Sequence, residues 1–317
     1  MKNKESLKYT CLFGGGAIRG AAHVGAIKAF EENNIVCGTY GGSSVGSIIA
    51  VLWALGYSHE ELAEVFLGVN FELFRDISFG FNTKFALSKG EVFLDWFREL
   101  VEKKYYGENY KKGENEPVKF KDIEKNLIII STNIKDFTCH EFSTSKTPDF
   151  EVAMAVRISC CAPGLMKPVS MGEKLLVDGD LLKGKPMWAL CDSLKDTKDR
   201  IMEIRLEGEY TGVDNTPIDY VNGMYSCITS CETDFIKEIY QNNDMFDYVV
   251  LNAGNVVVFD FNYPSEKRQS IIDSGYNQAI EYLKNVLPYK KQKLYSIYTK
   301  MLDHIRLDHQ RILHHRF

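Results

Sequence analysis

Residues 35–55 read IVCGTYGGSSVGSIIAVLWAL: a short apolar run, a glycine- and serine-rich turn at 41–47, and an apolar run of helical length. Residues 8–33 show the same order, with the run KYTCLF, the turn Gly14–Gly16 and a helical pattern from there onward. Strand, glycine turn and helix therefore occur twice in succession. This alternation predicts an α/β domain whose mostly parallel sheet is covered by helices on both faces.

Later segments continue the alternation. Strands are predicted at 123–134, 174–177, 201–206 and 248–261, and helices at 186–194 and 220–242. Two segments have the composition of insertions. Residues 70–85 carry five phenylalanines, which either line an acyl channel or lid or fill the core. Residues 102–121 are charged and contain glycine, which predicts a solvated loop or hairpin.

Composition excludes several classes of protein. The formal net charge of -5 argues against nucleic acid as a partner, because phosphate binding needs a basic surface. We find no secretory signal and no apolar run long enough to span a bilayer. The eight cysteines are scattered, so we expect reduced cysteines and a cytoplasmic location. Cys227 and Cys231 lack a second pair of ligands, so no metal site is expected.

The C-terminal residues 289–317 differ in charge from the rest of the chain. They carry a formal charge of +5, which leaves -10 for residues 1–288. Their apolar residues recur at helical spacing, and Pro288 marks the expected start of an amphipathic helix. We therefore expect a main domain at 1–288 and a basic helix at 289–317. This helix either lies on an anionic membrane surface or packs against its own domain.

The second glycine turn matches the pattern G-x-S-x-G, with Ser44 at its centre. A sharp turn between strand and helix holds such a serine in a strained conformation with its hydroxyl exposed. The N-terminus of the following helix favours negative charge there. Ser43 and Ser47 lie outside the centre of the pattern, and we expect them to pack the turn or cap the helix.

The first glycine turn fits neither of two common phosphate-binding loops. Arg19 stands where G-x-G-x-x-G requires glycine, and the Lys and Ser/Thr of a phosphate loop are missing after Gly20. Free backbone N–H groups beside a basic residue fit an oxyanion hole instead.

The proton acceptor for the serine is the remaining question. Four of the seven histidines lie within residues 304–315, and we expect His23 to pack or hydrogen-bond on the first helix. Asp178, in the stretch LLVDGD at 175–180, follows a predicted strand and is the best carboxylate candidate for a direct base. In the alternative, Asp178 only caps the next turn through its side chain.

Together these motifs resemble the patatin-like phospholipase family. The matching blocks are GGGAIRG at 14–20, GGSSVGS at 41–47, ISCCAPG at 158–164 and VDG at 177–179. The resemblance implies a three-layer α/β/α fold, with residues 1–288 as the catalytic domain. It further implies hydrolysis of acyl esters of glycerophospholipids through an acyl-enzyme, without metal or organic cofactor.

The same resemblance assigns roles to single residues. Ser44 is the nucleophile and Asp178 its base, while Gly15, Gly16 and Arg19 stand where the family has its oxyanion hole.

Two positions depart from the family pattern. Asp180 stands where the family usually has Gly or Ala, and Gly184 stands where many members have Asn. Both bear on the environment of the proposed base. Two alternatives remain open: an esterase or thioesterase for soluble acyl substrates, and a non-catalytic module that binds lipid or protein. We expect a phospholipid or other acyl-lipid substrate and peripheral membrane contact, and the sequence leaves the oligomeric state undetermined.

Overall fold

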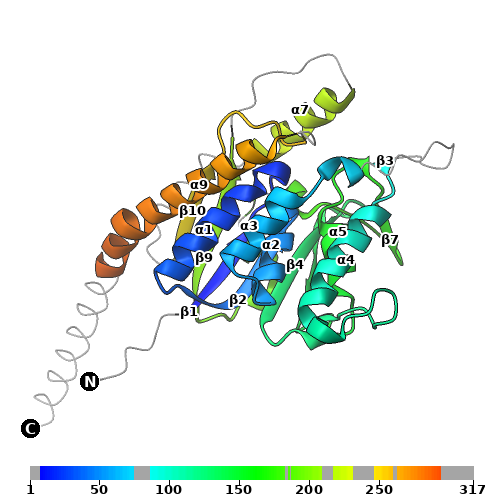
Figure 1. The fold of residues 1–317 in the computed structure, drawn as a ribbon, viewed down its shortest axis with the longest axis horizontal. Helices are drawn as coiled ribbons and strands as arrows, with labels where there is room; N and C mark the ends of the chain where they lie inside the picture. Colours follow the sequence, from blue (N-terminus) through cyan, green and yellow to red (C-terminus); the bar gives the residue numbers. More distant parts are fainter. Residues whose placement is uncertain are drawn as a thin grey trace, which may run out of the picture.

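The computed structural model describes residues 8–74, 86–182, 185, 187–208, 217–230, 246–259 and 263–293. Its centre is an eight-stranded sheet in the order β10-β9-β1-β2-β4-β8-β7, with β5 paired to β4 (Figure 1). The strands are β1 (Lys8–Phe13), β2 (Val36–Ser43), β4 (Asn126–Asn133), β5 (Thr138–Ser143), β7 (Val169–Met171), β8 (Lys174–Val177), β9 (Arg200–Glu207) and β10 (Phe246–Asn252). A separate pair consists of β3 (Ala86–Ser88) and β6 (Gly164–Met166).

The five strands from β10 to β4 are parallel, whereas β5, β8 and β7 join the sheet in antiparallel pairs. The helices are α1 (Ala21–Glu32), α2 (Val45–Ala54), α3 (His59–Gly68), α4 (Glu91–Tyr106), α5 (Val152–Ser159), α6 (Met187–Leu190), α7 (Pro217–Ser230) and α9 (Ser265–Glu281). The predicted α/β class with a mostly parallel central sheet is confirmed.

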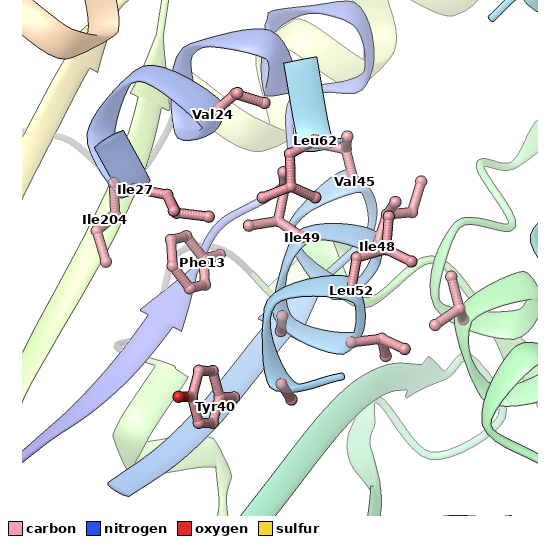
Figure 2. Close-up of a cluster of buried hydrophobic side chains, with 14 of the residues drawn as sticks. Phe13, Val24, Ile27, Tyr40, Val45, Ile48, Ile49, Leu52, Leu62 and Ile204 are labelled. Carbon is pink, nitrogen blue, oxygen red and sulfur yellow. The ribbon is translucent and has the colours of Figure 1, made fainter. Parts of the chain in front are cut away.

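Side chains alternate between the two faces of the sheet, as the two-residue period of a strand requires. Phe13 of β1 and Ile204 of β9 belong to the larger core, under α1 and α2 (Figure 2). Leu12 and Ile201 belong to the opposite face of the sheet, where they pack with Met187 of α6 in the smaller core. Helical segments therefore cover both faces, which gives the three layers that the family resemblance implies.

Helices α1 and α9 lie side by side on one face of the sheet (Figure 1). Their contact depends on two glycines. A Cβ on Gly25 would lie 2.0 Å from the Ile272 carbonyl oxygen, and one on Gly275 would lie 2.2 Å from the Ala22 carbonyl oxygen. Only residues without a side chain allow the two backbones to approach this closely.

Cys11 of β1 and Cys37 of β2 form a disulfide between neighbouring parallel strands, with 6.1 Å between their Cα atoms. The expectation that all cysteines are reduced is wrong for this pair. The sequence did not indicate the disulfide, because the two cysteines are brought together only by the register of β1 and β2. The inference of a cytoplasmic location rested on reduced cysteines and loses that support. Cys139, Cys160, Cys161 and Cys191, which the structure also describes, are free thiols.

The two predicted insertions are partly ordered parts of the domain. Helix α4 extends to Tyr106, so the start of the segment at 102–121 is helical, and Phe120 near its end is fully buried. The prediction of a solvated loop is wrong there, because the apolar face of α4 continues into this segment. In the aromatic segment, Phe71 and Phe74 pack against the core, as the second interpretation expects. Residues 75–85, with the other three phenylalanines, lie outside the described residues.

The helix predicted to start at Pro288 does not begin there. Helix α9 continues through a π-helical turn at Tyr282–Val286 and remains helical through residues 287–293. A wider turn directly before a proline accommodates the missing N–H of that residue. Lys290 is buried and donates to the Phe246 carbonyl at 2.8 Å, so the helix packs on the domain here. Residues 294–317 lie outside the described residues, and no described helix has the length and apolar character needed to cross a membrane.

Candidate active site

Ser44 lies in the sharp turn between β2 and α2. Its backbone has φ 49° and ψ -130°, a conformation that a residue with a side chain rarely adopts. The flanking glycines permit the turn: a Cβ on Gly42 would lie 2.2 Å from the Gly46 carbonyl oxygen, and one on Gly46 2.0 Å from that of Phe13. The turn therefore places the Ser44 hydroxyl at the N-terminus of α2, as G-x-S-x-G predicts.

Neighbouring serines hold this turn in place. The Ser44 amide donates to Ser159 Oγ at 2.9 Å, and Ser159 Oγ donates to the Ile130 carbonyl of β4 at 2.7 Å. Ser47 Oγ donates to the Ser44 carbonyl at 2.6 Å. The predicted packing role of Ser47 is confirmed, and Ser159, at the end of α5, links the turn to the next strand.

Asp178 lies directly after β8 and faces Ser44. Ser44 Oγ donates to Asp178 Oδ2 at 2.8 Å, although 134 residues separate the two in sequence. Asp178 Oδ1 accepts from the Asp180 amide at 2.8 Å. The two interpretations of Asp178 are thus compatible, since one oxygen caps the next turn and the other accepts from the serine. Burial, followed by the charge of Asp180, raises the pKa of Asp178 to about 8.

Asp180 is the first of two residues with contacts that sequence reasoning missed, although its position beside the proposed base was noted. Its Oδ1 accepts from the Gly15 amide at 2.9 Å and from Ser43 Oγ at 2.7 Å. Its Oδ2 is buried and has no hydrogen-bond partner among the residues that the structure describes. Asp180 therefore joins the two glycine turns, and Ser43 binds this carboxylate instead of only packing its own turn. The departure from the family pattern was the signal. Gly184, the other departure, lies outside the described residues.

The three residues predicted for an oxyanion hole have different environments. Gly15 lies beside Ser44, because a Cβ on it would be 2.7 Å from the Ser44 Cβ. Gly16 has φ 156°, in the region that favours glycine. The Arg19 guanidinium donates through Nε and Nη2 to the Val256 carbonyl at 2.9 and 2.7 Å. Its side chain thus ties the first turn to the loop after β10.

Tyr225 of α7 is the second residue that sequence reasoning missed. Its hydroxyl donates to Asp178 Oδ1 at 3.3 Å and also interacts with the Ser44 side chain. Burial, followed by the charges of Asp178 and Asp180, raises the pKa of Tyr225 well above its usual value. No motif surrounds this tyrosine in the sequence, so only the packing of α7 onto the site could find it.

Apolar side chains adjoin this polar cluster. Tyr225 packs with Ala162, Leu165, Val258 and Phe259 in a small buried group of its own, which Ala17 and Leu181 border. Ser44 is only 6% exposed and Asp178 1%. The serine and the carboxylate are therefore shielded from water by apolar groups.

The described histidines lie in other settings. His23 is fully buried, and its Nε2 lies 2.8 Å from the Gly14 carbonyl oxygen, as expected for a packed histidine. His59 contacts Glu31, and His140 contacts Lys174. The histidines within 304–315 lie outside the described residues. In the described part of the chain, Asp178 is the acceptor of the Ser44 hydroxyl.

Known proteins resemble this chain in sequence and in fold. A model of the patatin-like phospholipase family matches residues 12–190. An uncharacterized protein of Acanthamoeba polyphaga mimivirus is 32% identical over 204 residues, 62% of this chain and 65% of that protein. The lysophospholipase NTE1 of Debaryomyces hansenii is 26% identical over 187 residues, 56% of this chain and 10% of the fungal protein.

A solved structure shows the same fold. The crystal structure of VipD from Legionella pneumophila superposes with a TM-score of 0.64 at 15% identity, covering 86% of this chain and 66% of VipD. Each of these three matches spans less than two thirds of the relative's own length. Because the family model matches more than half of the residues, this chain belongs to the patatin-like phospholipase family.

Proposed function

We propose that this protein is a lipid acyl hydrolase of the phospholipase A type, with Ser44 as nucleophile and Asp178 as base. The observation that carries the proposal is the 2.8 Å hydrogen bond from Ser44 Oγ to Asp178 Oδ2 at the N-terminus of α2. A hydroxyl within this reach of a carboxylate can lose its proton as it attacks. Membership of the patatin-like phospholipase family supports acyl ester chemistry.

The first half of the reaction forms an acyl-enzyme. Ser44 Oγ attacks the ester carbonyl while ionised Asp178 takes the hydroxyl proton. The tetrahedral intermediate then collapses, the bond to the alcohol oxygen breaks, and Asp178 returns the proton to the departing alcohol. The products of this half are the acylated serine and, from a phospholipid, a lysophospholipid.

The second half regenerates the serine. Water gives a proton to Asp178 and attacks the acyl carbonyl, and the fatty acid departs as Ser44 regains its proton from the aspartate. In both halves, the Gly16 amide would stabilise the charged oxygen, with the turn anchored by Arg19 on the Val256 carbonyl. The Gly15 amide would join it by releasing Asp180 Oδ1, to which it donates at 2.9 Å. Losing one such donor typically costs about 2.7 to 4 kcal/mol of barrier.

The apolar group beside the site supports a lipid substrate. Leu165, Val258 and Phe259 are buried next to Tyr225, which itself contacts the carboxylate. A long acyl chain can replace such side-chain contacts with contacts of its own, whereas a short polar ester cannot. A relative named for lysophospholipase activity favours the same class of substrate.

The Ser44→Ala variant tests the nucleophile. We expect release of fatty acid from phospholipid vesicles to fall by about a thousandfold or more, because only residual stabilisation by the rest of the site remains. Ser270→Ala, at an exposed position of α9, is the matched control and should retain full activity. Undiminished release by Ser44→Ala would refute the assignment.

The same assay separates the alternative functions. Faster turnover of short soluble esters or thioesters than of long-chain vesicles would favour a soluble-substrate esterase or thioesterase. A folded protein whose Ser44 does not react with a fluorophosphonate would favour a non-catalytic binding module.

A further inference from the structure

Two carboxyl groups share the buried centre of the site. Asp178 and Asp180 are each 1% exposed, and the Asp180 amide donates to Asp178 Oδ1. Asp180 extends its carboxyl group to Gly15 and Ser43, next to the proposed nucleophile. Two like charges in a dry site repel strongly, so such pairs lose their protons in two well-separated steps.

Nothing positively charged contacts this pair in the described part of the chain. The hydrogen bonds to the two carboxyl groups come from Ser43, Ser44, Tyr225 and the amides of Gly15 and Asp180. All of these donors are neutral, so no salt bridge compensates a second negative charge.

The other titratable groups around Asp178 also stay neutral. Burial raises the pKa of Tyr225 and of the Cys160 thiol well above their usual values and raises that of Cys161 to about 12. The charge of Arg157 lowers the pKa of both thiols, but its guanidinium donates to the carbonyls of Lys89 and Lys167 and not to either carboxyl group. The charge that Asp178 meets therefore comes from Asp180.

We propose that Asp180 is a positioning residue that makes the carboxyl pair hold one proton at neutral pH and thereby restricts the activation of Ser44 to alkaline conditions. This inference rests on the proposed function, in which ionised Asp178 is the base. The pKa of Asp178 near 8 agrees with it. A glycine or alanine at position 180 would leave Asp178 without the second charge.

The sign of the pH dependence follows directly. Asp178 accepts the serine proton only when ionised, and its ionised fraction rises with pH until the pKa of about 8 is passed. The rate of Ser44 reactions should therefore rise through this range and then level off. Removing the charge of Asp180 lowers the pKa of Asp178, so the same rise should occur at lower pH.

The Asp180→Asn variant tests the proposal. Asparagine keeps an oxygen acceptor for Gly15 and Ser43 but carries no charge. The rate of fluorophosphonate labelling of Ser44 rises with pH, and in this variant the rise should occur about one pH unit lower than in the wild type. At pH values below the rise, the variant should therefore be labelled about tenfold faster. Asp273→Asn, at an exposed position of α9, is the matched control without a shift. An unchanged limb in Asp180→Asn would overturn the proposal.

Infrared spectroscopy over a range of pH measures the protonation of the two carboxyl groups without any substrate turnover. The wild type should show one buried carboxylic acid that ionises near pH 8, and Asp180→Asn should lose that signal from the alkaline range. Identical titrations of two folded proteins would refute the inference even if Ser44→Ala confirms the proposed function. Conversely, the expected titration together with an active Ser44→Ala variant would refute the function and leave the shared proton standing.

Discussion

The most consequential single residue is Asp178, because one side chain both caps a turn and contacts Ser44, the proposed nucleophile. Its two oxygens accept from Asp180 N and Ser44 Oγ in different directions. When ionised, such a carboxyl group lowers the stability of the native state, since burial favours its neutral form. Stability is therefore given up at this residue in favour of the site.

The stability cost leads to a prediction for Asp178→Asn. The unfolded chain loses the proton of Asp178 above about pH 4, while the native state keeps it to about pH 8. Native stability therefore falls as pH rises between these values, and the variant escapes this loss. Between these pH values, the difference in unfolding free energy between Asp178→Asn and the wild type should grow in favour of the variant by up to about 1.4 kcal/mol per pH unit.

Urea unfolding at a series of pH values measures this difference. Asp273→Asn is the control for removal of an exposed carboxyl group. A gap between Asp178→Asn and wild type that stays constant from acidic to alkaline pH would contradict the raised pKa.

At the same scale, the sequence predicted some residues of the site and not others. Ser44 and Asp178 follow from local patterns, because a strained turn needs small neighbours and a strand end favours a turn-capping aspartate. The contact of Asp180 with Gly15 spans 165 residues of sequence and depends on the side-chain conformation. No local pattern encodes such a contact.

At the scale of elements, α7 brings a residue to the site from beyond the matched family region. The family model ends at residue 190, whereas α7 begins at Pro217. Asn222 and Tyr225 of this helix are both buried, and Asn222 Oδ1 accepts from the Phe259 amide at 3.1 Å. The sequence predicted a helix at 220–242, but which of its faces meets the site depends on how the helix docks.

The hydrogen bond that Tyr225 of α7 donates to Asp178 leads to a prediction for the Tyr225→Phe variant. The tyrosine hydroxyl stabilises ionised Asp178, so its removal should raise the pKa of that carboxyl group. The acidic limb of Ser44 labelling should move to higher pH by up to about one unit. Tyr220→Phe is a control in the same helix, at a side chain that is 65% exposed. A downward shift in Tyr225→Phe would show that the hydroxyl does not act on Asp178.

For the whole molecule, the sequence predicted the α/β class because strands and helices alternate along the chain, and the family resemblance implied the three layers. Strand order was not predicted, because β8 joins β4 and β9 joins β1 through contacts distant in sequence. The division at 288 and 289 remains a prediction, and the helix runs through this boundary without interruption.

Removal of residues 294–317 tests the membrane interpretation of the C-terminal segment. These residues hold four Lys or Arg against two Asp, and the cut preserves the packing of Lys290. If the segment binds anionic lipid, sedimentation with anionic vesicles should weaken by roughly tenfold. Binding to zwitterionic vesicles and hydrolysis of soluble esters should not change. An insoluble or unfolded product would instead support packing against the domain.

The disulfide between Cys11 and Cys37 makes the walls of the site unequal. It joins the two strands that lead into the first glycine turn and into Ser44, and so adds a covalent link to their backbone pairing. On the other side of the site, Asp180 and Tyr225 are held by hydrogen bonds to Gly15 and Asp178 and, at Tyr225, by apolar packing. We therefore expect the covalently linked side to keep its position in any movement of the Tyr225 side.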